Sequence, residues 1–187
     1  MGQDGQLTLR QAASDDLTTA EVARLHELMR DAFATDEHGG FTEDDWQHAL
    51  GGTHFLLEEG GSIVSHAAVV ERELRVSGVP LRTAYVEAVA TDPRRQGQGL
   101  GTQVMRAVGA FIDAGEWQLA ALGTSSHGFY ERLGWRTWPG PSFVRGVDGD
   151  VATPDEDGYI MVRPTPRSPA LDPDAPISCE WRAGDVW

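Results

Sequence analysis

The sequence predicts one α/β domain whose sheet is largely antiparallel. Residues 22–33 and 100–112 carry apolar side chains at helical spacing, and three strand-like runs between them are joined by turns too short to hold a helix. Strands and a helix alternate after residue 115, which completes the α/β pattern. The chain has 187 residues, 40% of them hydrophobic and 24% charged, as expected for one globular domain.

The first fifty residues predict a strand and two capped helices. Thr18 and Glu21 have the spacing of a capping box, and the apolar residues that follow lie on one helical face. Thr42 can cap a second helix, which ends at Gly51. The expected elements are a strand over Leu7–Ala13, a helix from Thr18 to near Thr35 and a short helix from Thr42 through Trp46 to Leu50.

The middle of the chain predicts a meander of strands followed by a helix. Gly60-Gly61 and the segment 77–80 are turn signals that favour antiparallel hairpins. Gly134 is placed to end the last helix of this part. The expected elements are strands over His54–Glu58, Ile63–Val76 and Leu81–Thr91, a helix over Gly99–Ala114, a strand over Trp117–Leu122, a helix over Ser126–Leu133 and a strand over Trp135–Trp138.

The last fifty residues predict little regular structure. Gly, Pro and Asp dominate residues 139–158, so an irregular stretch is expected there. A strand is expected over Tyr159–Val162, a Pro-rich connector over Pro164–Pro176, and a final strand over Ser178–Trp181.

The charge of the chain limits its chemistry and its partners. The sequence has 29 acidic and 15 basic residues, a formal net charge of −14. Such a field repels nucleic acid and anionic membranes, so neither is expected as a partner, although the acidity also serves plain solubility. Every basic residue is an arginine. The absence of lysine excludes Schiff-base chemistry and the Walker phosphate loop.

The cysteine and histidine content argues against disulfides and metal sites. Cys179 is the single cysteine. His48, His54 and His66 fall on a helix and two different strands without ligand spacing, so no metal is expected. His66 lies in an apolar strand and is expected to be a hydrogen-bonded core residue. The start of the chain lacks the features of a signal peptide and no apolar run reaches the length of a membrane span, so a cytoplasmic location is expected.

A glycine-rich loop joins a strand to a helix and predicts an anion site. Asp92-Pro-Arg-Arg95 precedes Gln96-Gly-Gln-Gly-Leu-Gly101, and an amphipathic helix follows. The backbone of such a loop approaches a ligand closely, and the amides of a helix N-terminus favour a pyrophosphate. Thr102 stands where the dinucleotide fingerprint has its third glycine. A glycine-rich helix start without a ligand is the alternative.

Two motifs resemble the signatures of the GNAT acyltransferase superfamily. Gln96-x-x-Gly99-x-Gly101 resembles its coenzyme A loop, and Phe129–Trp135 resembles its second signature. The resemblance implies a single domain over residues 1–187, with a mixed, mostly antiparallel central sheet, helices on both faces and a splayed pair of strands that holds acetyl-CoA. It assigns the pantetheine arm and the acetyl group to Val89, Ala90 and Thr91, and the pyrophosphate to Gln96, Gly97, Gln98, Gly99, Leu100 and Gly101. Arg94 and Arg95 either add charge near the phosphates or face solvent.

Further segments resemble one branch of this superfamily, the aminoglycoside 2'-N-acetyltransferases. They include Ser65–Val70, Tyr85–Ala90, Thr153–Gly158 and the closing Trp181–Trp187. The resemblance implies acetyl transfer from acetyl-CoA to the 2'-amino group of aminoglycoside antibiotics, conferring resistance, and a homodimer. Aminoglycosides are polycations, and their sites need several carboxylates. Residues 31–45 carry six acids and residues 148–157 carry five, with no arginine in either run. The alternative for each run is a solvated acidic loop.

Three residues are the candidates for catalysis by direct attack of the amine in a ternary complex. Glu87 is the candidate base, acting through a water, since strand alternation puts it on the same face as Val89. The backbone N–H of Val89 is the candidate donor to the thioester carbonyl. Tyr130 is the candidate acid for the departing thiolate. The alternatives are a structural ion pair for Glu87 and a core position for Tyr130.

By resemblance, the substrate contacts come from Asp36, Glu87, the backbone of Ala88, Asp155 or Glu156, and the terminal carboxylate of Trp187. One more contact falls on Gly123, Thr124 or Ser125, and the sequence does not choose among them. Two other functions stay open. One is acetylation of another amine, such as a polyamine, an amino sugar or a protein N-terminus. The other is a catalytically silent protein that only binds acyl-CoA.

Overall fold

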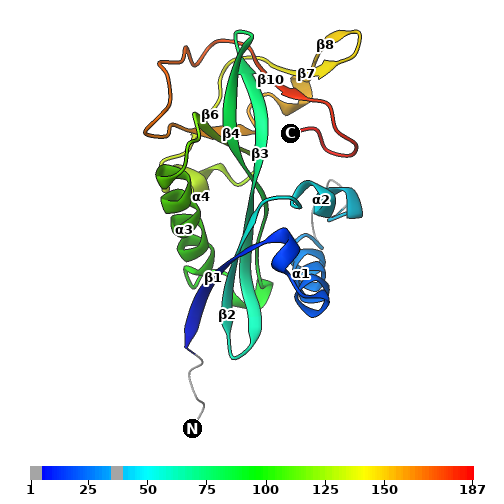
Figure 1. Cartoon of the computed structure of the whole chain (residues 1–187), viewed down its shortest axis with the longest axis vertical. Coiled ribbons are helices and arrows are strands. Elements are labelled where there is room, and N and C mark those ends of the chain that lie inside the picture. The colour runs from blue at the N-terminus through cyan, green and yellow to red at the C-terminus, as the bar shows by residue number, and fades with distance from the viewer. Residues whose placement is uncertain (1–5, 35–39) are drawn as a thin grey trace. The chain divides into compact units, whose positions relative to one another are not determined.

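The computed structural model of the chain describes residues 6–34 and 40–187 (Figure 1). It contains two compact units, each made of two stretches of sequence. The first unit holds the described residues up to Val70 together with Glu87–Gly109, and the second holds Glu71–Val86 together with Ala110–Trp187. The strands β3 (Ser62–Val76) and β4 (Val79–Thr91) and the helix α3 (Leu100–Ala114) therefore contribute residues to both units.

An antiparallel meander forms the sheet of the first unit. The strand β1 (Leu7–Ala13) pairs with β2 (Thr53–Glu59) along its whole length, and β2 pairs with the first part of β3. Gly60 and Gly61 turn the chain between β2 and β3 with φ values of +57° and +81°. The strands that the sequence predicts here are confirmed, and so is the glycine turn that joins β2 to β3 in a hairpin.

Two capped helices cover a core in the first unit. The helix α1 (Thr19–Ala32) starts at the predicted capping box of Thr18 and Glu21, and α2 (Glu43–His48) starts at a second box in which Thr42 is paired with Asp45. The short helix η1 (Ser14–Asp16) links β1 to α1. The buried side chains of this core are Ala12, Leu25, Leu28, Met29, Trp46, Ala49, Leu56, Ile63, Ala68 and Ala90.

A mixed sheet runs through the second unit in the order β6-β9-β5-β4-β3-β10-β7-β8. The pairs β4–β5 and β10–β7 are parallel, whereas β5–β9, β6–β9, β10–β3 and β7–β8 are antiparallel. The strands that complete this sheet are β5 (Leu119–Gly123), β6 (Arg136–Thr137), β7 (Ser142–Gly146), β8 (Gly149–Ala152), β9 (Ile160–Arg163) and β10 (Ile177–Glu180). The final strand is thus confirmed. The short helices are α4 (His127–Glu131) and η3 (Pro154–Glu156).

The prediction of an irregular stretch over residues 139–158 is wrong. This stretch holds the hairpin of β7 and β8, labelled in Figure 1, with Gly146 paired to Gly149 at its turn. All four residues of β8 are exposed, so the strand has no apolar alternation for a sequence to reveal. The parallel partner β10 and the hydrogen bonds of Ser142 hold the hairpin instead. Among the described residues, no helix combines the length and the apolar character that a membrane span requires.

Candidate active site

The strand β4 changes character at Glu87, where it enters the first unit. Its residues from Thr83 to Val86 are buried, but Glu87, Ala88 and Val89 are all half-exposed. Ala88 has a φ of +50°, a left-handed conformation that an L-residue with a Cβ rarely adopts. The alternation of side chains between the two faces of the strand, expected from Glu87 to Val89, is therefore interrupted at Ala88. The result is a short stretch of strand whose backbone and side chains reach the surface together.

Side chains of β3 hold β4 at this interruption and just after it. Nδ1 of His66 lies 2.8 Å from the carbonyl oxygen of Ala88, and the hydroxyl of Ser65 donates to the carbonyl of Ala90 at 2.9 Å. The Ser65 hydroxyl also lies 2.8 Å from Oγ1 of Thr91. His66 is completely buried and hydrogen-bonded, as predicted. These contacts tie Ala88, Ala90 and Thr91 to β3 within the first unit, which also holds Glu87 and Val89.

The glycine-rich loop follows this segment within the same unit. Asp92 caps the short helix η2 (Pro93–Arg95), and α3 begins at Leu100. Gly97 and Gly99 have φ values of +76° and +79°, and a Cβ built on either would meet no atom within 4 Å. The backbone is therefore open to a ligand at both glycines. Since the first amides of a helix have no partner within the helix, this loop fits the pyrophosphate of coenzyme A.

The two arginines before the loop are engaged in ion pairs. Arg94 donates to both carboxylate oxygens of Asp92 at 3.0 and 2.8 Å, and its side chain is 83% exposed. These hydrogen bonds hold the pKa of Asp92 below its usual value. Arg95 forms a two-point ion pair with Glu59, which also lowers the pKa of that carboxyl. Of the two alternatives for Arg94, the structure thus favours the solvent-facing one.

A capped helix end positions Tyr130 in the second unit. The backbone carbonyl of Tyr130 accepts hydrogen bonds from the N–H groups of Leu133 and Trp135 at 2.8 and 3.2 Å. The N–H of Gly134 donates to the carbonyl of Glu131. With Gly134 at a φ of +87°, this is a Schellman motif, and the ring of Trp135 packs against that of Tyr130 with centroids 6.2 Å apart. Burial raises the pKa of the Tyr130 phenol, so it keeps its proton.

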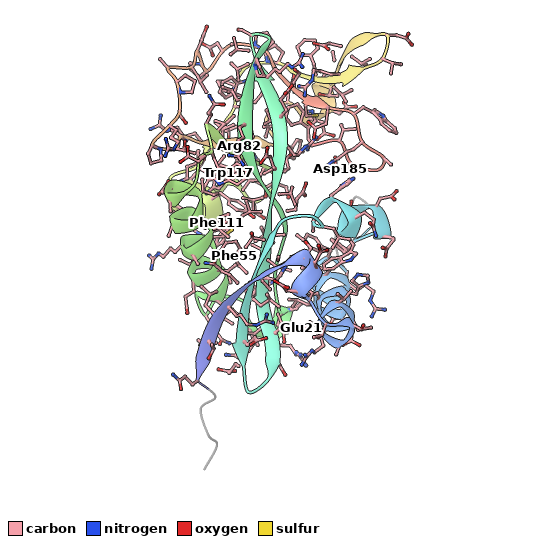
Figure 2. The ribbon with its side chains drawn as sticks, in the orientation of Figure 1. Glu21, Phe55, Arg82, Phe111, Trp117 and Asp185 are labelled. Carbon is pink, nitrogen blue, oxygen red and sulfur yellow. The ribbon has the colours of Figure 1, made fainter. Side chains whose placement is uncertain are left out.

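The carboxyl terminus is docked in the second unit. The Trp187 side chain is buried, and its Nε1 donates to Oγ1 of Thr153 at 3.1 Å. Asp185, labelled in Figure 2, accepts the Trp187 N–H at 3.2 Å, and a guanidinium nitrogen of Arg182 lies 3.5 Å from the terminal residue's carbonyl oxygen. A Cβ on Gly123 would come within 3.3 Å of the Trp187 carboxyl carbon. Of the three positions left open by the sequence, Gly123 is thus the one beside this carboxyl group.

A buried arginine that the sequence analysis missed fastens this tail. Arg72 is 4% exposed, and it donates through Nε to Glu180 at 2.7 Å and through Nη2 to the carbonyl of Val186 at 2.9 Å. Its guanidinium also lies 4.5 Å from the centre of the Tyr85 ring. The sequence does carry a signal for the burial of Arg72. Side chains alternate between the two faces of β3, which puts Arg72 on the same face as the buried Leu74.

The acidic runs differ in what their side chains do. Asp155 and Glu156 lie in η3, which follows directly on Thr153, the hydrogen-bond partner of Trp187. Asp157 instead accepts hydrogen bonds from the backbone and the hydroxyl of Ser142, so its role is structural. Asp36 lies outside the described residues. Within the described part of the chain, no three His, Cys, Asp or Glu side chains come together as metal ligands would.

Sequence comparison relates the chain to known acetyltransferases. The family model of the acetyltransferase (GNAT) domain matches residues 14–138. An aminoglycoside 2'-N-acetyltransferase from Mycolicibacterium fortuitum is 42% identical over 176 residues, which cover 92% of this chain and 87% of that protein.

Solved structures show the same fold at low identity. A GNAT family acetyltransferase from Brucella melitensis in complex with acetyl-CoA has a TM-score of 0.62 and 16% identity, over 96% of this chain and 97% of that chain. The GNAT acetyltransferase YhbS from Escherichia coli in complex with CoA has a TM-score of 0.64 and 14% identity, over 97% and 93% of the two chains. The fold class that the sequence predicts is confirmed. The chain belongs to the GNAT acetyltransferase family, in the same branch as the aminoglycoside 2'-N-acetyltransferase of M. fortuitum.

Proposed function

We propose that the protein transfers the acetyl group of acetyl-CoA to the 2'-amino group of aminoglycosides, by direct attack of the amine in a ternary complex. The 42% identity with the M. fortuitum enzyme supports the substrate. The geometry supports the reaction type through one observation, the left-handed Ala88 that opens a buried strand beside a glycine-rich loop. A thioester bound along this strand would meet backbone N–H groups that can polarise its carbonyl.

The acetyl-CoA side of the site would lie in the first unit. The amides of Gln96–Gly101 would hold the pyrophosphate, and the strand residues Val89–Thr91 would pair with the pantetheine arm. This orientation brings the thioester oxygen to the N–H of Val89, which stabilises negative charge as the amine adds to the carbonyl carbon. Acetyl-CoA enters as a co-substrate, and no metal takes part in the proposal.

Proton transfers complete the proposed reaction. An ammonium nitrogen has no lone pair, so the amine gives up one proton to solvent before it adds to the carbonyl carbon. Glu87 takes the second proton from this nitrogen, through a water, as the new C–N bond forms. The C–S bond then breaks, and the phenol of Tyr130 gives its proton to the sulfur. The raised pKa of the Tyr130 phenol fits this role, because the group carries its proton until the thiolate appears. Free CoA and the acetylated drug are the products.

The drug side of the site would use carboxylates and backbone groups. We assign the ammonium groups of the aminoglycoside to Asp36, Glu87, Asp155 or Glu156 and the Trp187 carboxylate, with backbone contacts at Ala88 and Gly123. The docking of Trp187 beside Gly123 and Thr153 supports this assignment, because it groups three of the expected contact regions in the second unit. Carboxylates at partly exposed positions pair with ammonium groups without the penalty of full burial.

We further propose that residues 1–187 act as a single GNAT domain, as a homodimer in the cytoplasm, without nucleic-acid or membrane partners. The net charge of −14 supports the last point. The exposed side chains of Val147 and Val151 on the β7–β8 hairpin support association with a second copy. Light scattering over a range of concentrations measures the mass, and a monomer at all concentrations contradicts the dimer.

A thiol-release assay tests the reaction and its position. Aminoglycosides with a 2'-amino group should release free thiol from acetyl-CoA, and analogues with a 2'-hydroxyl should not. Mass spectrometry should find one added acetyl group. Turnover with polyamines, amino sugars or peptide N-termini alone would select another amine as the substrate, and CoA binding without any thiol release would identify a silent binding protein.

A further inference from the structure

Four groups of the first unit form a continuous hydrogen-bonded chain that ends on the interrupted strand. The hydroxyl of Ser14 lies 2.9 Å from Nε2 of His54, Nδ1 of His54 lies 3.0 Å from Nε2 of His66, and Nδ1 of His66 lies 2.8 Å from the carbonyl oxygen of Ala88. Both imidazoles are completely buried. Two buried histidines in contact need a reason, because apolar side chains fill a core at less cost.

The acceptor at the end of the chain determines where every proton lies. The carbonyl of Ala88 can only accept, so Nδ1 of His66 carries a hydrogen. Nε2 of the neutral His66 ring then accepts from Nδ1–H of His54, and Nε2 of His54 accepts from the Ser14 hydroxyl. Burial lowers the pKa of both histidines, and the proximity of His54 lowers that of His66 further, which keeps both rings neutral.

The backbone of Gly52, the residue before β2, anchors the far end of the hydrogen-bonded chain. The N–H of Gly52 donates to the Ser14 hydroxyl oxygen at 3.2 Å, and the Ser14 N–H donates to the carbonyl of Gly52 at 3.1 Å. Gly52 has no room for a side chain, since a Cβ there would come within 2.1 Å of the Val69 carbonyl oxygen. The hydroxyl of Ser14 is thus held in place, and its one hydrogen serves the closer acceptor, His54.

The peptide that His66 holds also carries the N–H proposed to bind the thioester. The carbonyl of Ala88 and the N–H of Val89 belong to one peptide unit, and none of the described peptide bonds is cis. In a trans peptide these two groups point in opposite directions. We propose that His66, supported by His54 and Ser14, is a positioning residue that holds the 88–89 peptide from behind and aims the Val89 N–H at the carbonyl of acetyl-CoA. This inference rests on the proposed role of Val89.

The same hydrogen bond explains how an alanine keeps a left-handed conformation. Without a partner, the Ala88 peptide would rotate toward an ordinary strand conformation, and the Val89 N–H would turn with it. A hydrogen bond donated to a carbonyl also polarises the N–H of the same peptide, which strengthens the bond that this N–H makes. The fixed direction of the Val89 N–H and its polarisation should both stabilise the transition state more than they strengthen the binding of the drug.

The first test measures the tautomers in the unmodified protein. Nitrogen-15 chemical shifts of labelled histidines distinguish a protonated Nδ1 from a protonated Nε2. His54 and His66 should both carry their proton on Nδ1 at neutral pH. A His66 ring protonated on Nε2, or a charged ring, overturns the proposal, whether or not any variant folds.

The second test observes the acetyl carbonyl directly. The carbonyl of acetyl-CoA labelled with carbon-13 should absorb at a lower wavenumber when bound to the unmodified protein than when free in solution. Infrared difference spectra measure this shift. His66→Asn keeps a donor near the position of Nδ1 and should retain the shift, whereas His66→Leu has a similar size but no donor and should lose at least about half of it. The kcat of His66→Leu should fall about tenfold or more, with KM for acetyl-CoA within about threefold, since a complete oxyanion donor is worth about 10²–10³.

A control and a set of outcomes separate this inference from the proposed function. His26→Leu removes another imidazole of the first unit, one packed on Trp46 rather than on β4, and should change neither the shift nor kcat. A folded His66→Leu protein that keeps the full carbonyl shift overturns the role of His66. No shift in the unmodified protein overturns the role of Val89 as well. A normal set of shifts in a protein that acetylates no aminoglycoside supports His66 and contradicts only the substrate.

Discussion

The carboxyl group of Trp187 lies against Gly123, so close that a Cβ at residue 123 would stand 3.3 Å from the carboxyl carbon. A chain end that frays in solvent would not have such a fixed neighbour. Four independent contacts hold this end: the Trp187 indole on Thr153, the Trp187 N–H on Asp185, and Arg72 and Arg182 on the carbonyls of the tail. The tail is a built part of the second unit.

This arrangement predicts that residues added after Trp187 weaken the binding of aminoglycosides. Adding two glycines after Trp187 moves the terminal charge away, so KM for aminoglycosides should rise about tenfold, the equivalent of one charge-assisted hydrogen bond. KM for acetyl-CoA should stay near its original value, and thiol release at low salt measures both. Adding two glycines before Gln6 is the control. An extended protein with an unchanged drug KM would return Trp187 to a structural role.

Local signals let the sequence predict the helix starts. The predicted capping box at Thr18 and the predicted cap at Thr42 need only residues close in sequence, and both are present in the structure, where Thr42 forms a box with Asp45 as well. The stop at Gly134 is equally local, since a glycine at a left-handed position favours the end of a helix. Elements held by distant partners were not predictable in this way. The exposed strand β8 depends on β7, which depends in turn on β10 more than thirty residues later.

The candidate site shows the same division. The glycine-rich loop and the signature around Tyr130 are continuous in sequence, so the sequence alone is enough to predict their residues as site candidates. The left-handed Ala88 was not, because alanine carries no preference for that conformation and a histidine 22 residues away holds its carbonyl. For Arg72 the alternation in β3 does signal burial, but its partners Glu180 and Val186 lie more than a hundred residues later, so its role in holding the tail is not visible in the sequence.

Glu87→Gln tests the proposed base. The amide keeps the size of the carboxylate and one of its acceptor oxygens but cannot take a proton, so kcat/KM should fall by about 10²–10⁴. The affinity for CoA, measured by calorimetry, should barely change. Glu27→Gln, on the exposed side of α1, removes the same charge elsewhere and serves as the control. Full turnover in Glu87→Gln would leave Glu87 as a structural or substrate-binding carboxylate.

Tyr130→Phe tests the proposed acid. The ring still packs on Trp135 and the Schellman motif uses only backbone atoms, so the fold around residue 130 should persist. The loss should fall on kcat, with little change in KM for the drug, because the phenol acts as the thiolate leaves. Steady-state kinetics separate the two parameters, and the melting temperature checks the fold. A raised drug KM with an unchanged kcat would assign Tyr130 to substrate binding instead.

The buried histidine pair predicts how stability depends on pH. Burial lowers the pKa of His54 to about 4 and of His66 to about 3, from 6.5 in the unfolded chain. Below pH 6.5 the unfolded chain therefore binds protons that the folded protein does not, so the free energy of unfolding falls as the pH falls. Between pH 7 and pH 5 each histidine should remove about 2 kcal/mol.

Denaturant unfolding at pH 7, 6 and 5 measures this loss. The double variant His54→Gln, His66→Asn is less stable at pH 7 but should lose much less on going to pH 5, because its side chains do not titrate. Carboxyls with lowered pKa values, such as Glu21 and Asp92, do not obscure the comparison. Their contribution to the free energy of unfolding is lost mainly below their ordinary pKa values of 4.5 and 3.8, which lie below the pH range of the measurement. Equal losses in the two proteins would mean that the two histidines take up protons as readily in the folded protein as in the unfolded chain, and that the Ser14–His54–His66 chain does not hold its protons as inferred.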